Sequence, residues 1–93
     1  MKKIPNSLRK YRKAAGLKQK EVAELLGLKS TGMICRWEKG VCLPKLLNIF
    51  KLALLYRTMV DALFIDLRRV IVKELRTREE KVLRNRTKDN EDR

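Results

Sequence analysis

Apolar residues recur along most of this chain at spacings of three and four, the period of an amphipathic helix. Four such segments lie before residue 57, and each of the first three is followed by a glycine, at Gly16, Gly27 or Gly40. Glycine adopts the left-handed backbone conformation that commonly ends a helix. The pattern therefore predicts an all-helical fold, with helices over residues 7–15, 19–26, 31–39 and 45–56.

The same spacing predicts a small helical core. One face of each of the first three segments is apolar, through Leu8, Tyr11, Ala15, Leu17, Val22, Ala23, Leu26, Leu28, Ile34 and Trp37. Polar side chains that can accept from free N–H groups precede the first segment at Asn6 or Ser7, and the third at Ser30. Pro44 precedes the fourth, where its missing N–H costs no hydrogen bond.

The fourth segment is apolar almost all round, which is typical of a helix buried on more than one side. One side belongs to the small core. The other, with Leu47, Phe50 and Leu54 at i, i+3 and i+7, needs a cover. Either a C-terminal helix of the same chain or another subunit supplies it.

The last third of the chain predicts one long helix from about Val60 to Arg84, with no Pro or Gly to end it. Its apolar stripe weakens between Arg76 and Lys81. No apolar residue follows position 84, so we expect a disordered charged tail over residues 85–93. The predicted parts are a domain over 6–64, a helical extension over 65–84 and this tail. A possible interface comprises Leu47, Phe50, Leu54, Leu67, Val70 and Ile71.

Charge indicates a polyanionic partner. The 93 residues hold 24 Lys and Arg against 11 Asp and Glu, a net charge of +13. Residues 1–65 contain 14 of the basic residues and four of the acids, so most of the excess lies there. Binding of Lys and Arg to phosphates releases counterions, which favours a nucleic-acid partner over a merely solvated basic surface.

The residues that most catalytic or metal sites need are missing. There is no His, and the two cysteines, Cys35 and Cys42, lie seven residues apart without further ligands. We therefore expect no enzyme, no metal site and no cofactor. No apolar run is long enough to cross a membrane, no signal peptide is evident, and two cysteines indicate reduced thiols in a cytoplasmic setting.

Two runs of residues resemble the phage-repressor/Cro-type (XRE-like) DNA-binding family. The first comprises Leu8, Tyr11, Arg12, Gly16, Leu17, Gln19, Val22, Ala23, Leu26, Gly27 and Leu28; the second comprises Ile34, Cys35, Arg36, Trp37, Glu38 and Gly40. The similarity covers residues 7–64. It implies a five-helix lambda-repressor-like domain with an extended C-terminal helix, binding double-stranded DNA with the helix 31–39 in the major groove.

The resemblance also implies roles for individual residues. Gln19 would contact a backbone phosphate, although a plain surface glutamine is the alternative. Thr31, Gly32 and Arg36 would face base edges, and Arg36 could bind guanine through two hydrogen bonds or contact a phosphate instead. Met33 would touch a thymine methyl group or pack half-buried.

The resemblance also implies one structural pair, and the charge pattern indicates candidate phosphate contacts. Arg12 and Glu38 would form a partly buried salt bridge between the first and third helices. Phosphate contacts are expected from basic residues around the recognition helix, although these could equally form a solvated face: Arg9, Lys13, Lys29, Lys39 and Lys45. The predicted DNA-binding set is Gln19, Lys29, Ser30, Thr31, Gly32, Met33, Arg36, Lys39 and Lys45.

Two departures from the family pattern concern the recognition helix. One additional residue lies between Gly27 and Ile34, and Gly32 stands where a base-reading side chain is usual. Gly32 could allow close approach to a phosphate or leave sequence specificity modest.

These observations favour a sequence-specific transcriptional regulator, most simply a repressor that blocks polymerase as a homodimer. It would be cytoplasmic and nucleoid-associated, of bacterial or phage origin. An antitoxin that binds a partner toxin through residues 65–93 and represses its own promoter is the alternative, and a non-specific architectural binder is a third hypothesis. The C-terminal helix would dimerise, fold back over the fourth helix or bind another protein.

Overall fold

Helices make up nearly all the regular structure of the chain, as the periodicity predicts. The computed structural model describes residues 3–91, with side chains described as far as Arg86, and contains no strand over that range. The helices are α1 (Leu8–Ala14), α2 (Gln19–Leu25), α3 (Gly32–Lys39), α4 (Leu46–Leu55), α5 (Val60–Leu63) and α6 (Ile65–Glu91). The first four begin and end within one residue of their predicted limits.

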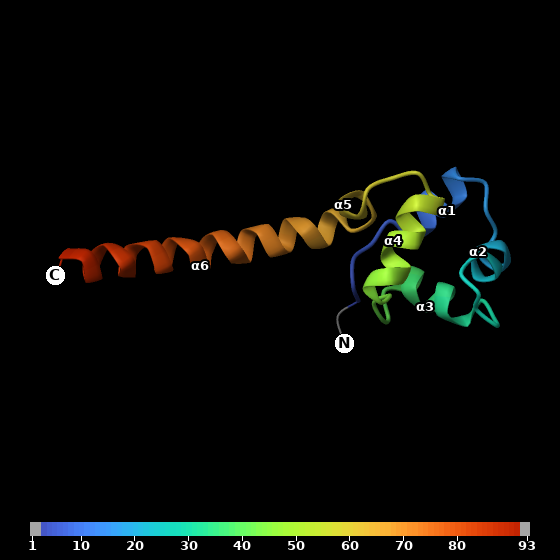
Figure 1. Cartoon of the computed structure of the whole chain (residues 1–93), viewed down its shortest axis with the longest axis horizontal. Coiled ribbons are helices and arrows are strands. Elements are labelled where there is room, and N and C mark those ends of the chain that lie inside the picture. Colours follow the sequence, from blue (N-terminus) through green and yellow to red (C-terminus); the bar gives the residue numbers. More distant parts are fainter. Residues whose placement is uncertain (1–2, 92–93) are drawn as a thin grey trace.

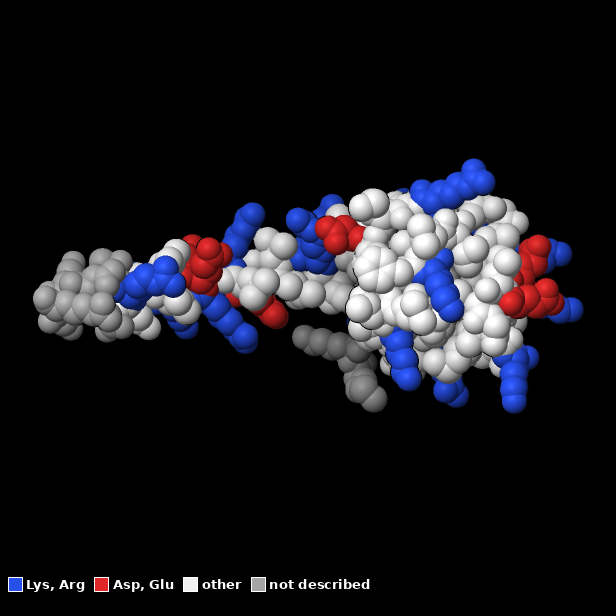
Figure 2. Space-filling model, in the orientation of Figure 1, with Lys and Arg blue, Asp and Glu red and all other residues white. Residues whose placement is uncertain are grey.

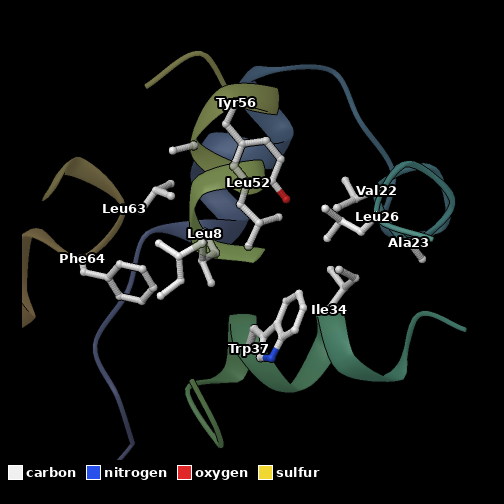
Figure 3. Close-up of a cluster of buried hydrophobic side chains, with 12 residues drawn as sticks. Leu8, Val22, Ala23, Leu26, Ile34, Trp37, Leu52, Tyr56, Leu63 and Phe64 are labelled. Carbon is white, nitrogen blue, oxygen red and sulfur yellow. The ribbon is translucent and has the colours of Figure 1, made fainter. Parts of the chain in front are cut away.

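The first five helices enclose one core. Side chains that are almost completely buried come from α1, α2, α3, α4 and α5, and include Leu8, Val22, Ile34, Leu52 and Leu63. Ile34 and Trp37 point from α3 toward Val22 and Leu52 (Figure 3). Aliphatic side chains supply most of this core, and their removal from water is its main stabilising term.

The N-terminal segment is held against the end of α3. Gly40 follows α3 with a φ of 75°, and its carbonyl accepts a 2.8 Å hydrogen bond from the N–H of Ile4. The side chain of Asn6 donates to the carbonyl of Trp37 at 3.1 Å and accepts from the N–H of Leu8 at 3.1 Å. Asn6 therefore serves α1 and α3 together.

The single long helix predicted from residue 60 is wrong, because the chain breaks at Phe64 between α5 and α6. In a continuous helix the carbonyl of Leu63 would accept from the N–H of Leu67. Here that carbonyl accepts from the N–H of Ser7 at 2.8 Å, and Phe64 turns into the core with φ −129° and ψ 41°. A contact from the other end of the domain thus interrupts the helix.

Beyond its first turns, α6 projects away from the rest of the molecule (Figure 1). It does not fold back over α4, whose outer residues Leu47, Phe50 and Leu54 are 67%, 52% and 78% exposed. The expected disordered tail also differs from the structure, since α6 continues through Glu91; residues 92–93 lie outside the described range. A continuous helix satisfies its backbone hydrogen bonds locally even where every side chain is polar.

Candidate nucleic-acid interface

The geometry of α3 separates a core face from an outward face. Ile34 and Trp37 are buried, and their burial fixes the rotation of the helix about its own axis. Met33, Arg36 and Lys39 are exposed in consequence. Both exposed charges on α3 are therefore basic, because the acidic residue of the helix, Glu38, is turned inward.

Glu38 lies at the centre of a hydrogen-bonded network that joins three helices. Its Oε2 accepts from Nε of Arg12 in α1 at 2.6 Å, and its Oε1 accepts from Nη2 of Arg12 at 3.2 Å. Oε1 also accepts from Nε2 of Gln19, the first residue of α2, at 3.0 Å. Nη1 of Arg12 donates to the carbonyl of Leu17 at 2.9 Å.

This network has an electrostatic consequence for Arg12. The side-chain hydrogen bond with Glu38 raises the pKa of Arg12 above its ordinary value, while burial acts in the opposite direction. Arg12 thus stays charged although the residue is buried. Neutralised by Glu38, it is a link between helices rather than a free cation for DNA.

A cavity of about 350 Å³ opens beside the network, between α1 and α3. It is lined by Arg9, Arg12, Gln19, Cys35, Glu38 and Lys39. Arg9 and Lys39 are exposed cations at this cavity, and one N–H of the Gln19 amide is committed to Glu38. The second N–H of that amide makes no hydrogen bond within the described chain, so it is available to an oxygen acceptor.

The remaining predicted residues flank α3. Lys29, Ser30 and Lys45 are exposed, whereas Thr31 is half-buried at the N-terminus of the helix. Ser30 was expected to be the N-cap of α3, but Thr31 occupies that position without a side-chain cap, and Ser30 Oγ instead accepts from the N–H of Gly32 at 3.4 Å.

Basic side chains predominate on the surface near α3. Lysines and arginines protrude along the lower edge of the domain in Figure 2, where α3 lies in Figure 1. In that view the acidic side chains lie at the end of the domain opposite α6, along α6, and where α6 joins the domain. A polyanion approaching α3 would therefore meet mainly basic side chains.

Sequence reasoning missed two features of the site. The sequence predicts either a phosphate contact or a plain surface side chain for Gln19, and neither includes the hydrogen bond by which its amide donates to Glu38. Asn6 was expected only as a cap, although it also donates to carbonyls at the end of α3. Neither contact leaves a local signal, because each joins residues at least 19 positions apart.

Other kinds of site are not evident in the described residues. Cys35 and Cys42 are free, and within residues 3–91 no group of three or more His, Cys, Asp or Glu side chains could hold a metal ion. Among the described helices, none has the length and hydrophobicity required to cross a membrane.

The family comparison agrees with this geometry. A family model described as helix-turn-helix matches residues 8–62, more than half of the chain. No curated protein and no solved structure matches the chain. The matched range contains α1 to α4, the Arg12–Glu38–Gln19 network and the outward face of α3. The chain therefore belongs to the Cro/C1-type (XRE-like) helix-turn-helix family, a regulatory rather than enzymatic family of DNA-binding transcription regulators.

Proposed function

We propose that the chain is a sequence-specific repressor that inserts α3 into the major groove of its operator. The observation that carries this proposal is the outward face of α3, where Met33, Arg36 and Lys39 are exposed above a buried Trp37. A rigid helix with a basic outward face matches the width and the charge of the groove.

Arg36 is the residue assigned to base reading. Its guanidinium can donate two parallel hydrogen bonds to O6 and N7 of guanine. Met33 precedes it by one turn on the same face and supplies an apolar contact for a thymine methyl group. Gly32 has no side chain, and a Cβ added there would meet only Ser30 Oγ at 3.5 Å, so the start of α3 leaves room for close approach of the DNA backbone.

The cavity beside Glu38 is assigned to a backbone phosphate. Arg9 and Lys39 supply charge, and the free N–H of Gln19 supplies a directed donor. Because Glu38 holds Gln19 in place, the donor is pre-oriented and loses little rotamer freedom on binding. Lys29, Ser30, Thr31 and Lys45 lie along the flanks of α3, where further phosphates would pass.

Selection of binding sites from random duplex DNA tests the proposal with the full chain. We expect a single enriched motif, repeated with twofold symmetry if two copies bind together. Recovery of no enriched motif, with random duplex bound as tightly as any selected sequence at physiological salt, would contradict sequence-specific binding and favour an architectural role. Repression is then tested by placing the selected motif across a promoter and measuring transcription with and without the protein.

A further inference from the structure

Helix α6 carries an apolar stripe that the described chain leaves exposed to solvent. Ile71, Leu75 and Val82 lie on one face of the helix and expose 45%, 57% and 56% of their surface. Beyond its first turns the helix extends away from the rest of the described chain (Figure 1). Since most helical stability in proteins comes from packing of an amphipathic face, such a helix needs a partner.

We propose that α6 pairs antiparallel with α6 of a second copy of this chain, about a twofold axis between Arg76 and Thr77. The seam follows alternating spacings of three and four, through Arg68, Ile71, Leu75, Arg78, Val82 and Asn85. In this seam Leu75 and Val82 occupy the first position of a heptad, and Ile71 and Arg78 occupy the fourth. In antiparallel packing each first-position residue meets a fourth-position residue of the other helix. Ile71 then faces Val82 of the second copy, and Leu75 faces Arg78, with each layer repeated by symmetry.

The charges beside the seam decide the orientation. In the antiparallel register Glu74 lies across from Lys81 of the second copy, and the twofold axis repeats this attraction. In a parallel pair, Glu74 would instead face Glu79 of the second copy, and Arg78 would face Arg78 of the second copy. The sequence therefore neutralises charge in one orientation and opposes like charges in the other.

The polar interruption of the apolar stripe lies at the centre of the proposed pair. Residues 76–81 contain no apolar side chain, and they lie at or near the twofold axis. Arg78 enters the seam there, one turn after Glu74 of its own helix. A polar layer within an apolar seam fixes register at some cost in stability, and here it holds the two Ile71–Val82 layers in step on either side.

The pairing also continues an apolar groove at the root of α6. A cavity of about 270 Å³ lies there, with Leu43, Ile49, Phe64, Leu67 and Ile71 among the residues that line it. Because Ile71 borders this groove, Val82 of the second copy would pack at its mouth. The interface is thus continuous with the domain rather than confined to two isolated helices.

The exposed stripe of α4 is a poorer candidate for self-association. The charged residues on and beside α4 are all basic, at Lys45, Lys51 and Arg57, so two such faces would repel each other. Helix α6 combines an exposed apolar stripe with charges of both signs, and Figure 2 shows acidic and basic side chains along its length.

The register has a consequence for DNA that rests on the proposed function. It separates the two Ile65 residues by about 34 Å along the helices, at ~1.5 Å per residue. The domains lie outward of these points, since α3 is on the far side of α5 from the end of α6 (Figure 1). The two recognition helices are then more than one DNA turn apart, and the next matching spacing is about two turns, roughly 21 base pairs.

Sedimentation equilibrium of the full chain without DNA tests the pairing. Wild type should be dimeric, and Glu74→Lys or Lys81→Glu alone should weaken the dimer by about tenfold, because two attractions become two repulsions. The double variant Glu74→Lys/Lys81→Glu should restore the wild-type constant. Glu80→Lys makes the same charge change on the opposite face of α6 and should have no effect.

Several outcomes would overturn the proposal. A wild-type chain that is monomeric at about 100 μM, where any dimer useful in a cell would form, excludes it. Tighter association of Glu74→Lys indicates a parallel pair, and loss of the dimer in Phe50→Glu but not in Glu74→Lys places the interface on α4. Failure here leaves the site selection unaffected, because that experiment detects a motif whether one copy or two bind.

Discussion

Nε of Arg12 in α1 lies 2.6 Å from Oε2 of Glu38 in α3, and the two side chains expose only 10% and 5% of their surface. Gln19 of α2 donates to the same carboxylate, so one buried acid connects α1, α2 and α3. The orientation of α3 depends on a charge network as well as on the core beneath it.

Breaking this buried pair should be costly. Arg12→Met leaves Glu38 without its charged partner in a poorly hydrated site, and we expect a loss of about 3–5 kcal/mol in the free energy of unfolding. Arg69→Met removes an arginine from the exposed pair with Asp66 and should change stability by less than about 1 kcal/mol. Urea denaturation of both variants measures the difference. Equal small losses would show that the Arg12–Glu38 pair is solvated in solution.

Gly40 should tolerate substitution far less than Gly16. Both have positive φ, 75° and 73°, so alanine at either position costs about 1–2 kcal/mol in backbone strain. At Gly16 a Cβ would meet nothing within 4 Å, whereas at Gly40 it would clash with the backbone of Ile4. We therefore expect Gly40→Ala to destabilise the chain well beyond Gly16→Ala in thermal or urea unfolding. Similar values for the two variants would mean that the N-terminal segment does not stay against α3.

Tyr56 should make stability fall at high pH. Burial, and secondarily the negative charge of Glu38, raises the pKa of Tyr56 to about 12 from its ordinary value of 10.0. Below pH 10 the tyrosine is protonated in both folded and unfolded chains, and its contribution is fully present. Between pH 10 and 12 the unfolded chain loses the proton while the folded chain keeps it, so the free energy of unfolding decreases.

The control for Tyr56 is Tyr56→Phe, which removes the titrating group and keeps the ring. Urea unfolding between pH 8 and 11.5 should show a shallower decline for this variant than for wild type. Parallel curves would place the Tyr56 hydroxyl in water rather than in the core.

Arg36 and Gln19 should affect DNA binding in different ways. Arg36→Ala removes a base reader and should cost about 1–3 kcal/mol at one base position, so that discrimination at that position is lost. Gln19→Ala removes a phosphate donor and should weaken all sequences alike. Lys20→Ala changes the next residue of α2, which lies outside the lining of the proposed phosphate site, and serves as a matched control.

Affinities of these variants for the selected site and for single-base substitutions separate the two roles. If Arg36→Ala and Gln19→Ala both bind like wild type, α3 does not lie in the groove as proposed.

Trp37 should report on the core and remain insensitive to DNA. It is the one tryptophan of the chain and is 4% exposed on the inner face of α3. We expect fluorescence typical of a buried indole, weak quenching by acrylamide and no change when the selected duplex is added. A large shift on DNA binding would instead indicate that Trp37 leaves the core and contacts the bases.

The sequence by itself determined the local elements of this protein and most of the core residues of its first three helices, although Ala15, expected to face inward, is exposed. Apolar spacing set the faces of α1 to α4, and Gly16, Gly27 and Gly40 marked the ends of the first three helices, because both signals act over only a few residues. The family pattern placed Arg36 on the outward face of α3 for the same reason, since the burial of Ile34 and Trp37 fixes the rotation of that helix.

Only the tertiary structure decided how distant segments use one another's polar groups. The Ser7–Leu63 hydrogen bond divides the long helix expected from residue 60, and the Gln19–Glu38 hydrogen bond holds a donor beside α3. The structure also directs α6 away from α4 and leaves both apolar stripes exposed. These contacts depend on which hydrogen-bonding groups and apolar faces come together in space. Helical periodicity carries no information about contacts between distant segments.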